Sequence, residues 1–199
     1  MMIYAKRLVT ILTFAFWAVL TVAPRMAWGG ICTEPVDTNE GPVVGMADKD
    51  VNACVYKGIP FAAPPSGQLR WKAPQPAVER SSIHQAHEFG SDCSQSSLIP
   101  VGNRPAGSED CLYLNVWRPR KEGVFPVMVW IHGGGFSRGS SSTPMYWGDR
   151  LAAQKDVVVV TFNYRLGAFG FMAHPELSEL DERGSSGNYG FLDQVAALQ

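Results

Sequence analysis

An apolar run that ends in three glycines restricts how this chain can fold more than any other feature. Val127 to Ile131 is apolar throughout, and Gly133 to Gly135 follow it after His132. A short apolar run is typical of a buried strand. The glycines predict a tight loop at its end, because glycine adopts backbone conformations that side chains forbid. A second run, Val157 to Phe162, is β-branched and apolar, and predicts a central strand buried on both faces.

Other segments predict the remaining elements of an α/β fold. They are a hairpin over Val43 to Val51, an irregular proline-rich segment from Gly58 to Pro65, a strand from Leu112 to Trp117, a helix from Asp149 to Lys155, and a helix from Asn188 to Gln199. Asn188 is expected to cap the last helix, and Phe191, Val195 and Leu198 form an apolar stripe along it. Strands that alternate with helices predict a sheet of the α/β class, with an antiparallel hairpin at its start. No helix-stop signal precedes Gln199, so we expect the amino-terminal piece of a longer protein.

Residues 1–29 have the pattern of a secretory signal peptide. Two basic residues precede an apolar stretch from Leu8 to Ala23, and possible cleavage sites follow Ala27 and Gly29. The stretch is shorter than the roughly 20 residues that a membrane-spanning helix needs. We therefore expect a secreted or periplasmic protein that contacts a membrane only through this segment, with one incomplete domain over 30–199. An uncleaved membrane anchor is the alternative.

The chain contains four cysteines, Cys32, Cys54, Cys93 and Cys111. Export permits disulfides, and four cysteines allow three pairings. We favour Cys93–Cys111, which closes a loop containing proline, glycine and serine and would stabilise the fold by about 3 kcal/mol through chain entropy. Cys32–Cys54 then follows by elimination. The spacings are not those of a zinc site.

Composition and charge argue against several kinds of partner. The 199 residues are 46% hydrophobic and carry a formal charge of −1, which is ordinary for a globular protein. A near-neutral chain without a basic cluster is not expected to bind nucleic acid. The histidines lack metal-site companions at a suitable spacing, so we expect neither a metal nor a cofactor.

The glycine loop itself can carry chemistry. Backbone N–H groups that converge on one point stabilise the negative oxygen that forms when an ester carbonyl is attacked. His132 to Gly135 has the HGGG pattern of such oxyanion loops in lipases and esterases. The alternative is a glycine-rich turn without a catalytic role.

Several segments together resemble the type-B carboxylesterase family, which has the α/β-hydrolase fold. They are Gly58 to Ala62 with Pro64-Pro65, Leu69-Arg70-Trp71, Glu109 to Val116, Val129 to Phe136, Asn163 to Phe171, and Gly187-Asn188 with Leu192-Asp193-Gln194. They follow the family's order from about Gly41 to Gln199. The resemblance implies the amino-terminal part of that fold, with an antiparallel hairpin and the first strands and helices of the central mixed sheet.

The resemblance also implies roles for individual residues. The structural pairs are Cys93–Cys111, as the family's first disulfide, and Arg70–Glu109 and Arg165–Asp193, as its two buried salt bridges. If these charges instead lay on the surface, they would contribute little. Gly134 and Gly135 match the glycines whose amides point at the oxyanion.

The catalytic triad is expected beyond Gln199. A literal G-x-S-x-G match does occur at Gly135 to Gly139, and a triad of Ser137, Asp156 and His174 is formally conceivable. A nucleophilic serine of this pattern needs a sharp strand-to-helix turn. Ser137 instead follows the triple glycine, and a serine-rich segment comes after it, so we reject this assignment.

The resemblance implies a serine-dependent carboxylic ester hydrolase that acts on a small-molecule ester, with the 199-residue chain inactive on its own. The alternatives are a catalytically inactive adhesion or binding protein of the same fold, and a non-functional truncated product. Cholinesterases of the family use a tryptophan in the first disulfide loop to bind a quaternary ammonium group. The segment between Cys93 and Cys111 has no aromatic residue, which argues against choline esters.

Overall fold

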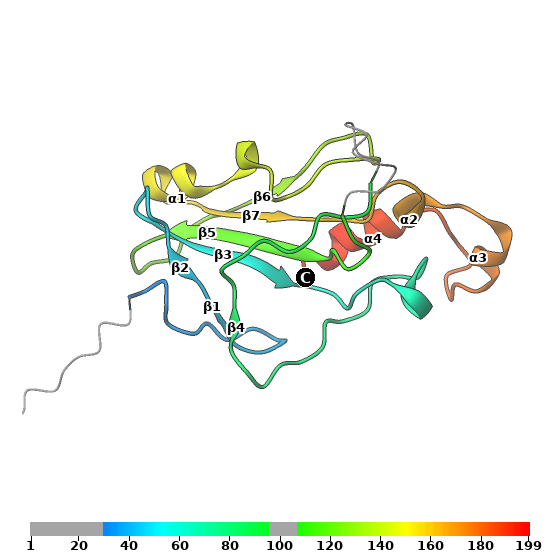
Figure 1. Ribbon diagram of the computed structural model, residues 1–199, viewed down its shortest axis with the longest axis horizontal. Coiled ribbons are helices and arrows are strands. Elements are labelled where there is room, and N and C mark those ends of the chain that lie inside the picture. The colour runs from blue at the N-terminus through cyan, green and yellow to red at the C-terminus, as the bar shows by residue number, and fades with distance from the viewer. Residues whose placement is uncertain (1–29, 96–106) are drawn as a thin grey trace, which may run out of the picture.

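The computed structural model describes residues 30–95 and 107–199, and the expected signal segment lies outside them. Its main feature is a five-stranded mixed sheet (Figure 1). The strands are β1 (Val43–Val44), β2 (Met46–Ala47), β3 (Ala53–Pro60), β4 (His84–Gln85), β5 (Tyr113–Pro119), β6 (Val127–Ile131) and β7 (Val158–Phe162). The α-helices are α1 (Asp149–Lys155), α2 (Gly167–Phe171), α3 (Pro175–Glu179) and α4 (Tyr189–Ala196), and short 3-10 helices span Gly67–Leu69 and Pro144–Tyr146.

The sheet has the strand order β2-β3-β5-β7-β6. Neighbouring strands from β2 to β7 are antiparallel, whereas β6 runs parallel to β7. In this register Val160 of β7 lies between Val116 of β5 and Val129 of β6. The predicted central strand is therefore confirmed, but its burial on both faces is not, because Val158 and Val160 are only partly buried. The sheet is the mixed α/β sheet that the sequence indicates.

The predicted hairpin is present but shifted along the chain. β2 pairs with β3, which begins at Ala53, and Asp48 accepts hydrogen bonds from the amides of Asp50 and Val51 in the turn between them. Val43 and Val44 belong instead to β1, which pairs in parallel with β4 in a separate two-stranded sheet. Turn residues mark a hairpin in a sequence, but they do not fix which flanking residues pair.

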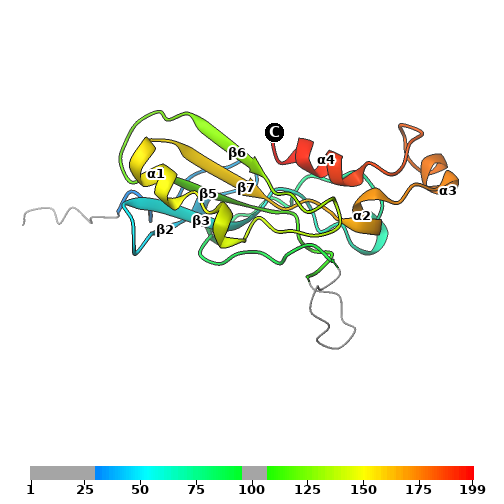
Figure 2. The same cartoon turned by 90° about the horizontal axis from the view of Figure 1, so that it is seen from above.

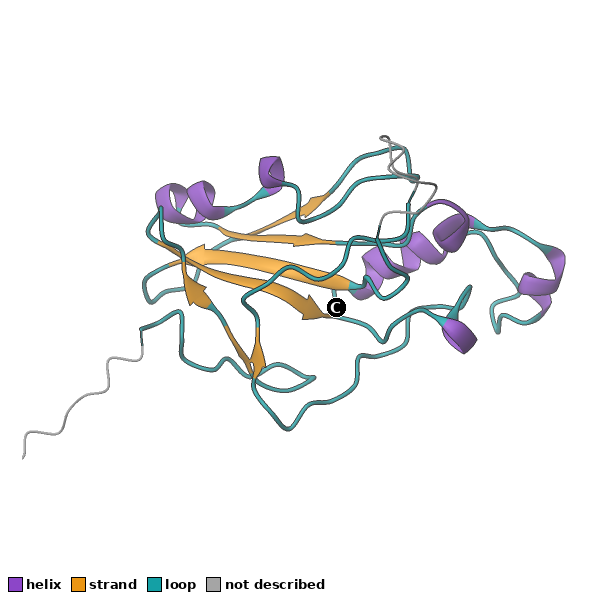
Figure 3. Ribbon diagram, viewed as in Figure 1, coloured by secondary structure: helices purple, strands orange, loops and turns teal. Residues whose placement is uncertain are grey.

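The proline-rich segment becomes irregular later than we expect from the sequence. β3 continues through Gly58 to Pro60, with a register shift between Tyr56 and Ile59. The side chain of Asn115 on β5 accepts a hydrogen bond from the Gly58 amide across this irregularity, at 2.9 Å. Most of the described chain from Phe61 to Gln95 and from 107 to Leu112 is loop (Figure 3), as its prolines favour.

The expectation that Val127 to Ile131 is buried is wrong for the described part of the chain. All five side chains of β6 are 37–62% exposed. β6 is the outer strand of the sheet, and β7 is its only partner among the described residues. An apolar run shows that a strand can be buried, but whether it is buried depends on what else covers it.

The helices form two groups (Figures 1 and 2): α1 packs on the sheet, and α2, α3 and α4 lie beyond one end of it. α1, with the bounds predicted, buries Ala152 against Ala53, Trp117 and Val159 of the sheet. α2 and α4 pack together beyond the carboxyl end of β7, and α3 projects next to them. No helix in the described ranges is both long and apolar enough to cross a membrane.

The last helix is shorter than predicted, and its cap differs. It runs from Tyr189 to Ala196, and the Asn188 side chain makes no capping hydrogen bond. The backbone carbonyl of Asn188 instead accepts from the amides of Phe191 and Leu192, at 3.1 Å each. The expected apolar stripe is about half exposed: Phe191, Val195 and Leu198 are 48%, 53% and 59% accessible.

Candidate active site

The glycine loop continues directly from β6 and turns sharply. Gly134, Gly135 and Phe136 have φ angles of 129°, 61° and 57°. A Cβ atom at Gly134 would overlap the carbonyl oxygen of Arg138, so only glycine fits there. A Cβ atom at Gly135 would meet no atom within 4 Å, so this residue borders open space.

The amides of Gly134 and Gly135 donate no hydrogen bond within the described loop. No residue in the described ranges accepts a hydrogen bond from either of them. The carbonyl of Gly134 closes the turn instead, accepting from the Ser137 amide at 3.3 Å and from the Ser137 hydroxyl at 3.1 Å. The loop is thus held through a carbonyl group, while two neighbouring N–H groups have no acceptor among the described residues.

His132 supports the start of this loop from the interior. Its side chain is 2% exposed and stacks on the Tyr164 ring, with the ring centroids 4.5 Å apart. The Tyr164 hydroxyl donates to the His132 carbonyl at 2.9 Å, and His132 Nδ1 lies 3.0 Å from the Gly133 carbonyl. Burial lowers the pKa of His132, so its ring is held neutral and shapes the backbone.

A buried polar network fixes the far end of the loop. Asn115 donates to the hydroxyls of Ser141 and Thr161, at 3.1 Å each, and Thr161 donates to the Ser141 carbonyl at 3.1 Å. Asn163 accepts from the Ser141 amide at 2.9 Å. No role in the loop was predicted for these residues from the sequence. The signal was present, because an amide or hydroxyl within an apolar strand is buried and therefore needs partners.

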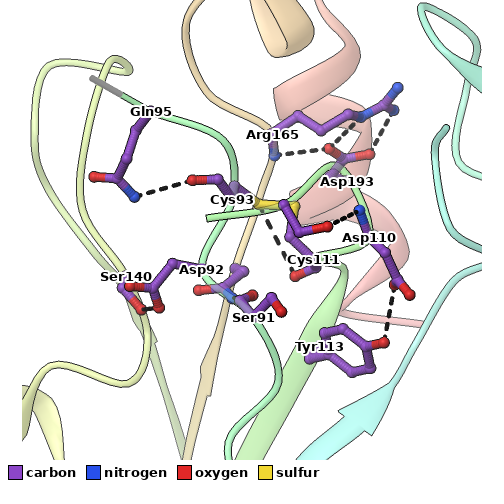
Figure 4. Close-up of a disulfide and its surroundings, with 12 residues drawn as sticks. Ser91, Asp92, Cys93, Gln95, Asp110, Cys111, Tyr113, Ser140, Arg165 and Asp193 are labelled. Carbon is purple, nitrogen blue, oxygen red and sulfur yellow. Dashed lines mark hydrogen bonds and ion pairs between the residues drawn. A yellow bond between two sulfur atoms is a disulfide. The ribbon is translucent and has the colours of Figure 1, made fainter. Parts of the chain in front are cut away.

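Two disulfides are present, with the pairings favoured from the sequence. Cys93 and Cys111 are joined with their Cα atoms 4.9 Å apart (Figure 4), and Cys32 and Cys54 with theirs 5.0 Å apart. All four cysteines are buried. The first disulfide packs against Leu112, Phe162 and Leu166 beside the glycine loop, whereas the second belongs to the cluster around β1 and β3.

The two predicted ion pairs are both formed, but only one is buried. Arg165 and Asp193 are 3% and 0% exposed, with Nη2 2.6 Å from Oδ1 and Nε 2.8 Å from Oδ2 (Figure 4). They connect the end of β7 to α4. Arg70 and Glu109 pair at 2.5 Å but are 38% and 22% exposed, so the expectation of a buried pair is wrong there. The Arg70 guanidinium lies 5.7 Å from the centroid of the Trp71 ring, and Trp71 is itself only partly buried.

The literal G-x-S-x-G match does not assemble a triad. The Ser137 hydroxyl is engaged with the Gly134 carbonyl, and Asp156 forms an ion pair with Lys121 at 2.7 Å. His174 uses Nδ1 to accept from the Glu176 amide and so caps α3. Residues 30–95 and 107–199 also contain no group of three or more side chains that could hold a metal ion.

The sequence of this chain is similar to one protein family and to several individual proteins. The sequence matches the carboxylesterase family over residues 33–199. It is 50% identical over 165 residues to fumonisin B1 esterase of Sphingopyxis macrogoltabida, which covers 81% of this chain and 30% of that protein. It is 48% identical over 168 residues to para-nitrobenzyl esterase of Bacillus subtilis, which covers 82% and 33%.

The fold is also similar to those of solved esterase structures. A PNB esterase structure superimposes with a TM-score of 0.72 at 45% identity, covering 83% of this chain and 33% of that one. A carboxylesterase of Geobacillus stearothermophilus gives 0.71 at 42% identity, with 82% and 33% covered. The chain therefore spans about a third of the length of the relatives it matches. The sequence match and these relatives together show that this chain belongs to the carboxylesterase family.

Proposed function

We propose that this chain supplies the oxyanion-binding part of a serine-dependent carboxylic ester hydrolase that acts on a small-molecule ester. The observation that carries this proposal is the pair of adjacent amides of Gly134 and Gly135, from which no described residue accepts a hydrogen bond, beside the open space that Gly135 borders. An oxyanion hole needs donors that are fixed before the reaction and are free to bind the substrate oxygen.

The chemistry follows from these two donors. A serine oxygen attacks the ester carbonyl carbon, its proton passes to a histidine, and negative charge develops on the carbonyl oxygen. The amides of Gly134 and Gly135 donate to that oxygen. The carbon–oxygen bond to the alcohol then breaks, the alcohol takes the proton, and water hydrolyses the acyl-serine. The serine, the histidine and its acid are proposed to follow Gln199 in sequence, and the residue after the serine supplies a third amide.

The exposure of β6 also favours a larger sheet. Its side chains are apolar and 37–62% exposed, although a parallel strand is normally buried on both faces. Further strands beside β6 would cover this surface and bring a nucleophile next to the glycine loop.

The substrate class is proposed from the relatives. Fumonisin B1 esterase, para-nitrobenzyl esterase and juvenile hormone esterase are named for different esters, and all match this chain at 45% identity or more. We propose an ester substrate without a quaternary ammonium group, because the segment between Cys93 and Cys111 has no aromatic residue. We also propose that residues 1–29 direct export, and the two disulfides fit an oxidising destination.

A chimera tests the proposed function. Residues 33–199 would replace the matched segment of the Bacillus subtilis para-nitrobenzyl esterase, and hydrolysis of para-nitrophenyl acetate would be measured. We expect the chimera to hydrolyse the ester and the 199-residue chain alone to release no nitrophenol. A folded chimera without turnover would contradict the proposal and favour a binding role, while turnover by the 199-residue chain would contradict our placement of the nucleophile.

A further inference from the structure

The segment that enters the first disulfide, Ser91 to Gln95, lies along the exit of the glycine loop. We call this segment the strap. Gln95 joins the two by pairing with both backbone groups of Gly139: its Oε1 accepts from the Gly139 amide and its Nε2 donates to the Gly139 carbonyl, each at 2.9 Å. The same Nε2 donates to the Cys93 carbonyl at 3.1 Å (Figure 4). A single side chain thus connects the disulfide to the loop.

Gly139 is in direct contact with the start of the glycine loop. It has a φ angle of 119°, and a Cβ atom there would overlap the Gly133 carbonyl and clash with the His132 ring. The two ends of the loop therefore touch at Gly139. Because Gly139 packs against Gly133, we expect a displacement of Gly139 to shift Gly133 and the amides of Gly134 and Gly135.

The strap has further anchors besides Gln95. Cys93 is fixed by the disulfide, and the Asp92 carboxylate accepts from the hydroxyls of Ser140 and Ser142 (Figure 4). Asn163 donates to the Ser91 carbonyl at 3.0 Å while it accepts from the Ser141 amide. With these anchors in place, Gln95 has a rigid base from which to set the position of Gly139.

We propose that Gln95 is a positioning residue for ester hydrolysis, because it fixes the Gly139 peptide and thereby the separation of the Gly134 and Gly135 amides from the substrate oxygen. This inference rests on the proposed function of those two amides. Small misplacements of catalytic groups are costly, at about 100-fold in rate for 1 Å. Gln95 touches no reacting atom and acts through Gly139.

Gln95→Glu tests the proposal with little change of shape. The carboxylate can still accept from the Gly139 amide, but both Nε2 donations are lost and a negative charge faces the carbonyl oxygens of Cys93 and Gly139. In the chimera we expect kcat to fall about 10- to 100-fold with KM within about twofold. Gln75→Glu is the matched control, because Gln75 is exposed and, among the described residues, its Nε2 donates only to the nearby Ala73 carbonyl. We expect the control to keep the parent kcat.

Nuclear magnetic resonance of the 199-residue chain, labelled with ¹⁵N-glycine, gives a readout that does not depend on activity. Gln95→Glu should accelerate hydrogen exchange at the Gly139 amide and shift the resonances of Gly134 and Gly135, whereas Gln75→Glu should do neither. Gln95→Met, which has a similar length without charge, replaces Gln95→Glu if that variant fails to fold.

The two readouts separate the failure of this proposal from that of the proposed function. An inactive parent chimera would overturn the proposed function, and the resonances alone would then decide whether Gln95 controls the loop. A normal kcat in an active Gln95→Glu chimera would overturn the positioning role, even if thermal stability fell. Unshifted Gly134 and Gly135 resonances would overturn it as well.

Discussion

Asp193 accepts three hydrogen bonds from a single residue, Arg165: from Nε at 2.8 Å, from Nη2 at 2.6 Å and from the backbone amide at 3.0 Å. The two side chains are almost completely buried. Removing one partner would leave an uncompensated charge in the interior, which costs more than the interaction itself contributes.

We therefore predict that Asp193→Ala destabilises the chain by about 3–5 kcal/mol, measured as the free energy of unfolding in urea. Lys121→Ala is the control, because the Lys121–Asp156 pair is more than half exposed on both sides. Its expected cost is at most about 1 kcal/mol. Equal effects of the two substitutions would show that burial does not govern the Arg165–Asp193 pair.

The second prediction concerns Gly135. Gly135→Ala should lower kcat of the chimera by roughly 100-fold, because the added methyl group occupies the space where the oxyanion is to bind. Gly184→Ala provides a close control: Gly184 has a φ angle of 64°, Gly135 has 61°, and an added Cβ meets no atom within 4 Å at either position. Both substitutions should cost similar stability, so a comparable loss of activity in both would indicate backbone strain rather than a blocked site.

The two disulfides should contribute equally to stability but differently to the loop. They close segments with sequence separations of 18 and 22, which correspond to about 3 kcal/mol each through chain entropy. We predict that replacing Cys93 and Cys111 by alanine accelerates hydrogen exchange at Gly139, and that replacing Cys32 and Cys54 leaves it unchanged. Urea unfolding and exchange measured on the same samples check both statements. An unchanged exchange rate at the Gly139 amide after loss of Cys93–Cys111 would show that this disulfide does not hold the loop in place.

His132 makes stability depend on pH. Burial lowers its pKa in the folded state below the ordinary value of 6.5, so the unfolded chain takes up a proton at a pH where the folded chain does not. Its contribution is complete above about pH 6.5 and is lost as the pH falls toward the folded-state pKa, with a slope of at most about 1.4 kcal/mol per pH unit. The difference in unfolding free energy between the parent and His132→Gln should change in this window. A difference that is constant from pH 7.5 to 5 would contradict the prediction.

Local sequence patterns predicted the elements whose burial is decided by near neighbours. The β-branched run at Val157 to Phe162 became the central strand β7, and the predicted helix from Asp149 to Lys155 became α1 without adjustment. Family motifs led to Arg165–Asp193, since both residues lie within the matched segments, whereas Cys93–Cys111 was favoured first by the loop that it closes and then by the resemblance. The Gly134 and Gly135 assignment remains a prediction.

The contacts that hold the loop were not predictable in the same way. Gln95 meets Gly139 across 44 positions, and Asn115 meets Gly58 across 57. Such pairs form only when strands such as β3, β5 and β7 are aligned with one another. The hydrophobic periodicity of each segment does not determine that alignment. The predicted burial of β6 was wrong for a related reason, because the outer strand of a sheet is buried only by segments that lie beside it.

The disulfide that anchors the strap determines when the glycine loop can take its final position. The strap's anchor at Cys93 is a disulfide bond. This bond forms only when an oxidant removes two electrons and two protons from the thiols of Cys93 and Cys111. Newly made chain in a reducing cytosol would hold the loop without this anchor. We expect the glycine loop to reach its final position only once the Cys93–Cys111 bond has formed.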